Sequence, residues 1–396
     1  MHVLILFRYF WPESRVAEEP HMLREVVKMH LDRGDTVRVV CGSADDCQQR
    51  WAEEFPEGVQ FTWFRAAIDR EGSMWRRAVN SARLLALGVS AVLTPSPLGV
   101  IYLFAYPPGF AGAIIAICRL VRRGTHTIFS FQDNLEYRIP GSVLRTLYRT
   151  YNRFCLRHAT RTVVLSDEMR EHLLDSFSNR DRESVAGRIE VLNNFYAEDV
   201  PPVVGGGATA YDIIYAGNHG PGQNLAYFLR AVARCRPAVP PRIVFYGNGT
   251  EKPALMRLAD ELGAEVEFRE PIDRRRIADE IRRARFGLVA MRADLPKYAF
   301  PSKIAAYTCN GTQVLVMSDP DGALGRWISH EGLGATLDPH DEARAANSLE
   351  KLLATAAAHS PTEVAERAQT LFGKNAFLSR LRAIVDQTTA SDSTCS

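Results

Sequence analysis

Residues 211–224 read YDIIYAGNHGPGQN: an apolar run of strand length, then a turn with three glycines, then the start of a helix. The run Tyr211–Ala216 predicts a buried strand, and Leu225–Cys235 predicts the helix that follows it. Because glycine lets the backbone approach a ligand closely and aim its amides at phosphate, the turn favours an anion site at the strand's end. One strand later, FYGNG at residues 245–249 repeats the arrangement. Two such turns in succession indicate a nucleotide site, with plain turns as the alternative.

A second stretch, PSKIAAYTCNG at residues 301–311, predicts a short helix ended by Asn-Gly, and Gln313–Met317 predicts a buried strand after it. The amides of a first helical turn lack intrahelical partners and carry partial positive charge, so they suit an anionic ligand. Lys303 would add a full charge where a nucleotide diphosphate could bind. An ordinary helix with an exposed lysine is the alternative.

Strand and helix patterns alternate along the whole chain. Such alternation predicts parallel β-sheets with crossover helices, here doubly wound open sheets. Between residues 199 and 210 the composition changes to Pro, Val and three consecutive glycines, which is typical of a linker. The sequence therefore predicts an α/β fold of two Rossmann-like halves, with ligands in the cleft between them. At the end of the chain we expect helices over 342–358, 364–371 and 377–387, then a disordered tail from Thr388.

Size and composition agree with this organisation. A chain of 396 residues is too long for one ordinary core, and a hydrophobic share of 46% is typical of globular proteins. A net charge of +2, without a long basic block, argues against nucleic-acid binding. The seven cysteines form no CxxC pair, so we expect neither a zinc site nor a disulfide framework. The opening residues show no secretory signal, and a cytoplasmic location is expected.

Two segments raise the question of a membrane. Leu98–Leu120 is apolar and long enough to span a bilayer, but Pro107-Pro108-Gly109 divides it, which favours a buried β-turn-α unit. A basic amphipathic stretch over 70–87 suits peripheral contact with anionic lipid, with a core helix as the alternative. Its members are Arg70, Arg76, Arg77 and Arg83, alternating with Trp75, Leu84, Leu85 and Leu87.

Polar and aromatic residues also follow strands of the first half. Asp133, just after the strand that ends at Gln132, is a candidate acceptor contact or general base, with helix capping as the alternative. Glu136 lies in the same loop. The loop after the first strand is either part of the binding cleft or a packed aromatic loop; its candidate residues are Arg8, Tyr9, Trp11 and Glu13.

In this order the motifs resemble the GT-B glycosyltransferases, above all the retaining family-4 group that builds bacterial surface polysaccharides and O-antigens. The resemblance covers most of residues 1–375. It is carried by VLILFRYFWPE, the Tyr106-Pro107-Pro108 turn, SFQD and VLNN in the first half, and by IIYAGNHGPGQNL, VFYGNGTEKPAL, FREPIDRRRIADEI and PSKIAAYTCNG in the second.

The resemblance implies an acceptor-binding domain over 1–200, a nucleotide-sugar-binding domain over 201–375, and a C-terminal helix and tail over 376–396 that returns to the first domain. It implies a UDP- or GDP-linked donor, a saccharide or polyprenyl-linked acceptor, and transfer with retention of configuration, without a metal or other cofactor. Asp133 and Lys303 are the expected catalytic residues, and Glu136 joins the acceptor side. The expected donor-binding residues are Gly217, Asn218, His219, Gln223, Gly247, Asn248, Gly249, Phe268, Arg275, Lys297, Ser302 and Lys303.

The chain departs from the family pattern in two places. Members typically carry two glutamates with seven residues between them, and Tyr298 and Ala306 occupy those positions here. The usual basic pair that holds the donor diphosphate is replaced by Asn218 and Gln223. We therefore expect Lys303, with Lys297, to hold the diphosphate.

Two alternatives to a transferase stay open. A catalytically silent homologue could act as a binding or scaffold subunit, which the missing glutamates favour. A non-hydrolysing nucleotide-sugar epimerase shares the two-domain layout but needs more convergent carboxylates and histidines than Asp133 and His219. For the transferase, a cytoplasmic location at the inner face of the cell membrane is expected.

Overall fold

The computed structural model describes residues 1–10, 19–43, 47–55, 57–66, 74–196, 209–355 and 359–390. The chain divides into two compact units. The first comprises Met1–Ala197, Lys297–Ala299 and Phe377–Ser396, and the second comprises Glu198–Pro296 and Phe300–Ala376. Trp11 and Glu13, Arg70 and most of the predicted linker lie outside the described residues.

The first unit is built on a parallel seven-stranded sheet in the order β3-β2-β1-β4-β5-β6-β7. Its central strands β4 and β5 are buried along their whole length, as a parallel sheet covered by helices on both faces requires. The strands are β1 His2–Tyr9, β2 Thr36–Ser43, β3 Val59–Arg65, β4 Val100–Phe104, β5 His126–Phe131, β6 Arg161–Val164 and β7 Ile189–Val191.

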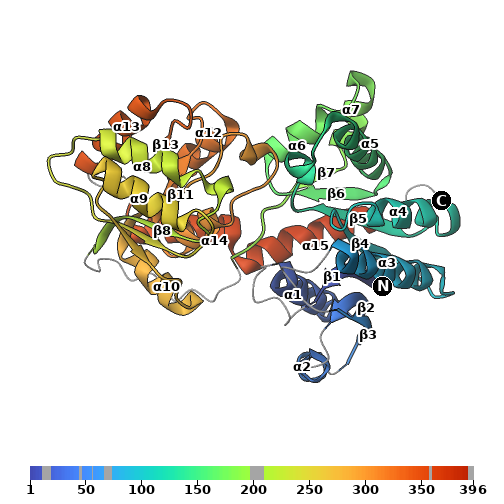
Figure 1. Ribbon diagram of the computed structural model, residues 1–396. Coiled ribbons are helices and arrows are strands. Elements are labelled where there is room, and N and C mark those ends of the chain that lie inside the picture. Colours follow the sequence, from blue (N-terminus) through green and yellow to red (C-terminus); the bar gives the residue numbers. More distant parts are fainter. Residues whose placement is uncertain are drawn as a thin grey trace. The chain divides into compact units, whose positions relative to one another are not determined.

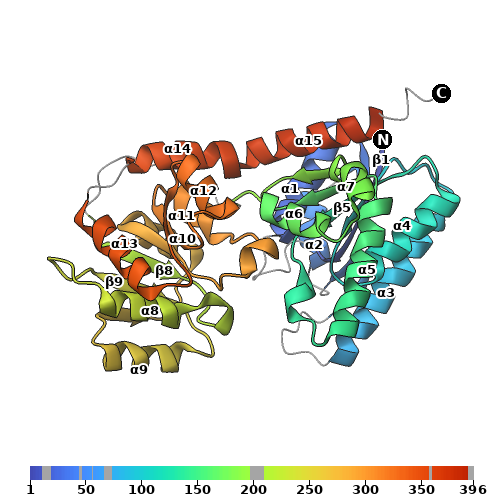
Figure 2. The same cartoon turned by 90° about the horizontal axis from the view of Figure 1, so that it is seen from above.

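Helices cover both faces of this sheet (Figure 1). On one face α1 and α15 share a hydrophobic core with the strands, through residues such as Leu23, Val26 and Leu381 (Figure 2). On the other face α3 packs against α4, and α4 against α5. The helices are α1 Glu19–Asp32, α2 Cys47–Glu54, α3 Met74–Leu93, α4 Phe110–Val121, η1 Leu135–Arg138, α5 Ser142–His158, α6 Asp167–Leu174, α7 Asn179–Ala186 and α15 Lys374–Ala390.

The second unit has a parallel six-stranded sheet in the order β10-β9-β8-β11-β12-β13. Its strands are β8 Tyr211–Ala216, β9 Ile243–Tyr246, β10 Val266–Arg269, β11 Ala284–Val289, β12 Gln313–Met317 and β13 Gly334–Leu337. Its helices are η2 Pro221–Gln223, α8 Leu225–Arg234, α9 Lys252–Leu262, α10 Arg274–Arg282, α11 Lys303–Cys309, α12 Ala323–His330, α13 Glu342–Ala354 and α14 Pro361–Phe372, and η3 Leu295–Lys297 ends where the chain leaves this unit.

The two sheets confirm the predicted fold class of two Rossmann-like α/β units. The apolar segment Leu98–Leu120 forms β4, a turn and most of α4, as predicted. Within the described ranges, no helix combines the length and the hydropathy that crossing a bilayer requires.

The prediction that a disordered tail begins at Thr388 is wrong. The helix α15 continues to Ala390, because Thr388 is buried and its hydroxyl donates to the carbonyl of Ile384 at 2.6 Å. A polar residue that satisfies its hydroxyl within the helix can face a core.

Candidate functional site

Two glycine-containing loops lie side by side at the carboxyl ends of β8 and β9. The amide of Gly217 donates to the carbonyl of Tyr246 at 2.9 Å, and the amide of His219 donates to the carbonyl of Asn248 at 2.9 Å. The side chain of Asn248 accepts from the amide of Gly249 at 2.8 Å. The structure therefore joins the two predicted turns into one surface at a strand edge, where α/β sheets bind ligands.

Glycine is required where these loops touch. Gly247 has a φ of +139°, and a Cβ atom there would lie 1.9 Å from the carbonyl oxygen of Gly217. A Cβ on Gly249 would lie 2.5 Å from the carbonyl oxygen of His219. Any larger residue would force the loops apart, so the glycines fix the spacing of the backbone groups that face this edge.

Lys303 reaches this surface from α11. Its ammonium lies 3.3 Å from Oε1 of Gln223 and 5.4 Å from the ring centre of Tyr215. A Cβ on Gly217 would lie 2.6 Å from Cε of Lys303, so the missing side chain makes room for the lysine. The hydroxyl of Tyr215 donates to the carbonyl of Asn218 at 2.6 Å. The charge of Lys303 thus lies beside the two residues that replace the usual basic pair.

The N-terminus of α11 contributes less positive charge to the site than the sequence suggested. It has only seven residues, and Ser302 at its N-cap makes no side-chain capping bond. So short a helix has few aligned peptide dipoles, so the positive charge at this edge comes mainly from the lysine side chain.

His219 is buried beneath the loops rather than displayed on them. Its ring lies between those of Tyr215 and Phe268, at centroid distances of 5.5 and 6.2 Å. Among the described residues neither ring nitrogen has a hydrogen-bond partner. Burial lowers the pKa of His219, and the nearby Lys252 lowers it further. The side chain is therefore neutral near pH 7 and adds no charge to an anion site.

Lys252 is a second cation that the sequence patterns did not single out. It is buried at the start of α9, and its ammonium donates to the carbonyls of Gly247 and Arg269 at 2.9 and 3.1 Å. It also pairs with Glu270 at 2.7 Å. The lysine fixes the carbonyls at the ends of β9 and β10 and holds the second glycine loop in place. Its signal in the sequence is a lysine at the first helical position after a glycine turn.

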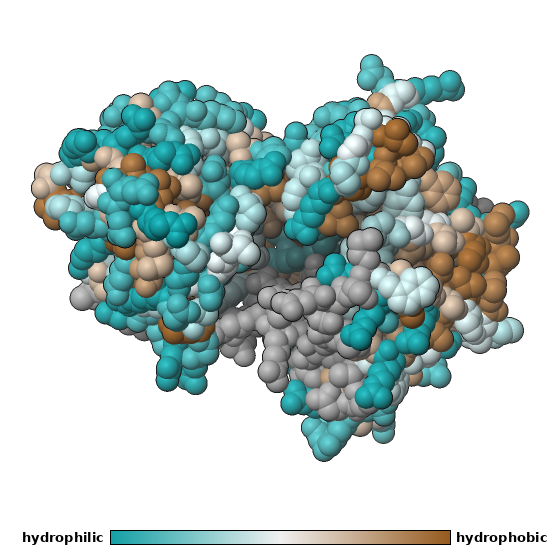
Figure 3. Space-filling model, in the orientation of Figure 1, coloured by the Kyte–Doolittle hydropathy of each residue, from teal (hydrophilic) through white to brown (hydrophobic). Residues whose placement is uncertain are grey.

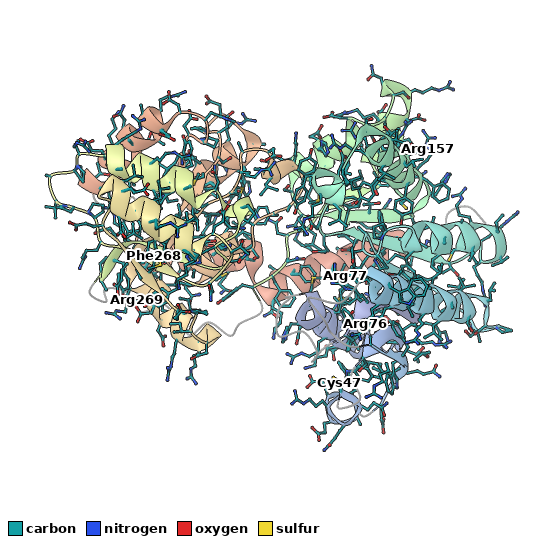
Figure 4. The ribbon with its side chains drawn as sticks, in the orientation of Figure 1. Cys47, Arg76, Arg77, Arg157, Phe268 and Arg269 are labelled. Carbon is teal, nitrogen blue, oxygen red and sulfur yellow. The ribbon has the colours of Figure 1, made fainter. Side chains whose placement is uncertain are left out.

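The remaining donor-side candidates lie farther along the same strand edge. Phe268 is at the end of β10, next to Arg269, which was not among the candidates (Figure 4). Arg269 donates to the hydroxyl of Tyr211 at 2.7 Å. Arg275 lies exposed in the first turn of α10.

Lys297, the second lysine expected at the diphosphate, is grouped with the first unit. Its ammonium lies 5.2 Å from the ring centre of Tyr298. Tyr298 stacks on Tyr137 at 5.5 Å and meets His172 edge-on at 4.9 Å, and its carbonyl accepts from the amide of Asn134 at 2.8 Å. Where the family pattern has a glutamate, this chain thus has an aromatic anchor on the first unit.

Asp133 lies at the carboxyl edge of the first sheet, directly after β5 and Gln132. Its Oδ1 atom is buried and has no hydrogen-bond partner within the described parts of the chain. Burial raises the pKa of this carboxyl, and Arg138 opposes the shift. Asn194 comes close along the same edge, donating to Oε1 of Gln132 at 2.6 Å. A desolvated carboxylate at a strand end is the arrangement expected of a general base.

Glu136, in contrast, is committed to an ion pair. It is buried, its Oε1 atom accepts from Nε and Nη2 of Arg149 at 2.9 and 2.6 Å, and its Oε2 atom lies 3.4 Å from His172. Burial acts to raise the pKa of Glu136, but the bonds from Arg149 outweigh it and hold the pKa below its usual value. Because both carboxylate oxygens of Glu136 already have partners, its role is structural, and it is a weaker candidate for binding the acceptor.

Of the candidates that the sequence placed in the loop after the first strand, the structure describes Arg8 and Tyr9, and both belong to the end of β1. The guanidinium of Arg8 lies 4.4 Å from the ring centre of Tyr106 and 5.1 Å from that of Tyr9. Arg8, Tyr9 and Tyr106 thus form a cation–aromatic cluster. In the parts of the chain that the structure describes, no three His, Cys, Asp or Glu side chains group as a metal site would need.

The comparisons with known proteins agree with this geometry. Residues 21–187 match the family described as glycosyl transferase 4-like domain, and residues 210–355 match glycosyl transferases group 1. The two matches lie on the two units in the order that the motifs predicted. The chain belongs to the GT-B glycosyltransferases.

Solved structures similar to this glycosyltransferase share its fold over almost the whole chain. Sucrose-phosphate synthase from Thermosynechococcus elongatus is 15% identical, with a TM-score of 0.72 over 98% of this chain and 99% of that one. Anabaena HepE in complex with UDP is 14% identical, with a TM-score of 0.65 over 98% and 100%. The lipopolysaccharide outer core galactosyltransferase WaaB is 12% identical, with a TM-score of 0.63 over 98% and 99%. The search of curated proteins found no match to the chain.

Proposed function

We propose that this glycosyltransferase moves a sugar, with retention of configuration, from a UDP- or GDP-linked donor to a saccharide or polyprenyl-linked acceptor in bacterial surface polysaccharide synthesis. The observation that carries the proposal is the approach of Lys303 to the paired glycine loops at the ends of β8 and β9. HepE, of the same fold, is described in complex with UDP, and WaaB is named as a lipopolysaccharide galactosyltransferase.

In the proposed reaction the donor diphosphate binds at the loop surface. As the bond to the sugar breaks, negative charge grows on the diphosphate and positive charge on the anomeric carbon. Lys303 is held beside Gly217 and Gln223 before the reaction, so it stabilises the leaving charge without reorganising. One charge-assisted hydrogen bond contributes about 1.5–3 kcal/mol, so Lys303 replaces part of the missing basic pair.

On the acceptor side we propose that Asp133 contacts the attacking hydroxyl. Its raised pKa makes it a stronger base than an exposed aspartate. The transfer is proposed to need no metal, because Lys303 would supply positive charge at the diphosphate.

The test is turnover with a panel of UDP- and GDP-sugars, read as nucleoside diphosphate released with and without saccharide or polyprenyl-phosphate acceptors. The anomeric configuration of the product, by NMR, decides retention. Acceptor-dependent release supports the proposal. Conversion of donor without acceptor would favour the epimerase. Absence of both nucleotide binding and turnover would favour the silent homologue, for which Tyr298 in place of a glutamate is the supporting observation.

An acceptor carried on a polyprenyl lipid is reached at a membrane. We therefore propose a cytoplasmic protein that works at the inner face of the cell membrane as a peripheral protein.

A further inference from the structure

The segment between β11 and α11 places a short piece of the first unit inside the sequence of the second. Lys297–Ala299 group with the first unit, whereas Pro296 before them and Phe300 after them group with the second. The middle residue of the three is Tyr298, at the position where the family pattern has a glutamate. Its role in this chain therefore has to be inferred from its contacts within the first unit.

Tyr298 contacts the loop that follows β5 at two points. Its carbonyl accepts from the amide of Asn134 at 2.8 Å, and Asn134 is the residue directly after Asp133. Its ring stacks on that of Tyr137, with 5.5 Å between the ring centres and 29° between the ring planes. One residue thus holds this loop beside Asp133 through its main chain, and three residues beyond Asn134 through its side chain.

A capping bond within the loop connects these two points. The side-chain oxygen of Asn134 accepts from the amide of Glu136 at 3.1 Å and caps the helical turn η1. Asn134 and Glu136 are both buried. Because the cap joins η1 to Asn134, a shift of η1 at Tyr137 would also move Asn134 and the neighbouring Asp133.

The ring of Tyr298 also reaches α6. It meets the ring of His172 edge-on, with 4.9 Å between the ring centres and 82° between the planes. Nε2 of His172 lies 3.4 Å from Oε2 of Glu136, so the same histidine also faces η1. Stacked and edge-on aromatic pairs at such distances attract each other beyond the effect of the area they bury. Tyr298 therefore joins η1 to α6.

The next aromatic residue of the segment has partners of its own in the second unit. Phe300 lies edge-on to Trp327 at 5.8 Å and 6.1 Å from the ring centre of Phe372. The chain passes from one set of aromatic contacts to the other across Ala299 alone. Since each ring has separate partners, the contacts of Tyr298 with the first unit are its own and do not simply follow from the packing of Phe300.

We propose that Tyr298 is a positioning residue of the transferase, which fixes the loop that carries Asp133. The position that has a glutamate in the family pattern would then serve the acceptor side of the reaction in this chain. The inference deepens the proposed function and rests on its assignment of Asp133 to the attacking hydroxyl. A misplacement of about 1 Å can cost on the order of 10²-fold in rate, so an anchor of this loop would control turnover.

Two other roles for Tyr298 make different predictions. A purely structural anchor would change the stability of the protein but not its rate, and a donor contact would change nucleotide affinity. A positioning residue changes kcat and the surroundings of Asp133. Burial raises the pKa of Asp133 against the opposing charge of Arg138, and Tyr148 of α5 is a further titratable neighbour. If the loop loosened, water would reach the carboxyl and its pKa would fall.

The test compares Tyr298→Ala with Tyr298→Phe in the full chain. The contacts with η1 and α6 use the ring and the carbonyl of Tyr298, so Tyr298→Phe should keep at least about half of the parent's kcat. Tyr298→Ala should lose about 10- to 100-fold in kcat, and the acid side of its pH–rate profile should move to lower pH. The affinity of both variants for UDP and GDP, measured by calorimetry, should stay within about twofold of the parent's.

Phe154→Ala is the matched control, because it removes another aromatic contact with a histidine in the same unit. Phe154 lies near the end of α5, 4.7 Å from the ring centre of His158. Figure 3 shows hydrophobic residues grouped over the region where α4 and α5 lie in Figure 1, so the surface there stays apolar without one ring. This variant should keep the parent's kcat and pH–rate profile.

The other half of the stack gives an independent variant. Tyr137→Ala should reproduce the loss of Tyr298→Ala, and the double variant should lose less than the product of the two single losses, because both remove the same contact. Circular dichroism checks that each variant folds. If Tyr298→Ala does not fold, Tyr298→Leu, which keeps an apolar side chain without a ring, takes its place.

A second measurement needs no turnover. The carboxyl pKa of Asp133, followed by ¹³C NMR in the full chain labelled at aspartate, should fall in Tyr298→Ala and stay unchanged in Tyr298→Phe and Phe154→Ala. An unchanged kcat or an unchanged pKa of Asp133 in Tyr298→Ala would overturn the proposal. An equal loss of kcat in Tyr298→Phe, or a loss of nucleotide affinity as large as the loss of kcat, would do so too.

The same data separate this inference from the proposed function. A parent that turns over every donor and acceptor pair as slowly as buffer, but whose Asp133 pKa falls in Tyr298→Ala, would reject the transferase and keep the anchor. Acceptor-dependent turnover that Tyr298→Ala leaves intact would reject only the anchor.

Discussion

Removing the charge of Lys303 is the sharpest test of the donor site. In Lys303→Met the stem that lies along Gly217 and Tyr215 keeps about its volume, and only the ammonium beside Gln223 is lost. If that ammonium makes one charge-assisted hydrogen bond to the diphosphate, its loss weakens binding by about 1.5–3 kcal/mol, which is about 10- to 150-fold in Kd. The lysine is only partly exposed, so solvent screens this interaction incompletely.

Isothermal titration calorimetry with UDP and GDP measures the change directly. Lys351→Met is the matched control, because Lys351 is exposed in the last turn of α13 and should leave nucleotide affinity unchanged. The affinity of the parent should also fall more steeply with salt than that of Lys303→Met. Unchanged affinity in Lys303→Met would refute the reasoning, and a loss seen in Lys303→Ala alone would show that packing, and not charge, is what the lysine supplies.

Four further predictions concern the loops, the carboxylates and the metal. Gly247→Ala should lower the free energy of unfolding by at least about 2 kcal/mol in urea titrations, whereas Gly124→Ala, whose Cβ meets no atom within 4 Å, should change it by no more than about 0.5 kcal/mol. Asp133→Asn should reduce kcat by about 10²- to 10⁴-fold at unchanged donor affinity, and an unaltered kcat would remove Asp133 from the reaction. Because burial raises the pKa of Asp133, the rate of the parent enzyme should fall on the acid side at a higher pH than an exposed aspartate would give. Glu136→Gln should lower the free energy of unfolding by about 1–3 kcal/mol at neutral pH, a modest loss because Arg149 is half exposed. The pKa of Glu136 is lowered in the folded protein, so its stabilising contribution is present above the unfolded pKa near ~4.3 and is lost as the pH falls through the folded pKa. The stability of the variant should therefore depend less on pH in the acid range than that of the parent. EDTA should leave turnover unchanged, and a loss reversed by Mg²⁺ would contradict the metal-free proposal.

Local sequence patterns were sufficient to predict those features that a single short segment determines. The glycine turns after Ala216 and Tyr246 and the apolar runs of β8 and β9 are each visible within about a dozen residues, so both the fold and the donor-side loops could be expected. The strand β13, Gly334–Leu337, and the helix α12 before it were missed, because β13 is short, begins with a glycine and is only partly buried. Its place in the sheet comes from pairing with β12.

The site features that the sequence did not predict depend on contacts between segments that are distant along the chain. Lys252 shows its role only once α9 places its ammonium against carbonyls of two different strands. Tyr298 shows its role only through Tyr137 and His172, more than a hundred residues earlier in the chain. Glu136 looked available for an acceptor because its partner, Arg149, is thirteen residues away and on another element. Spacing along the chain carries no information about such pairs.

The chain that builds the first unit is discontinuous, and this limits how the protein can be divided. A fragment ending near the linker would contain all seven strands of that unit but neither Tyr298 nor α15. One side of its sheet would then expose the apolar surface that Phe377, Leu381 and Val385 otherwise cover. Separate expression of the halves is therefore expected to give an aggregating N-terminal piece, and adding residues 377–390 as a peptide in trans is the natural way to rescue it.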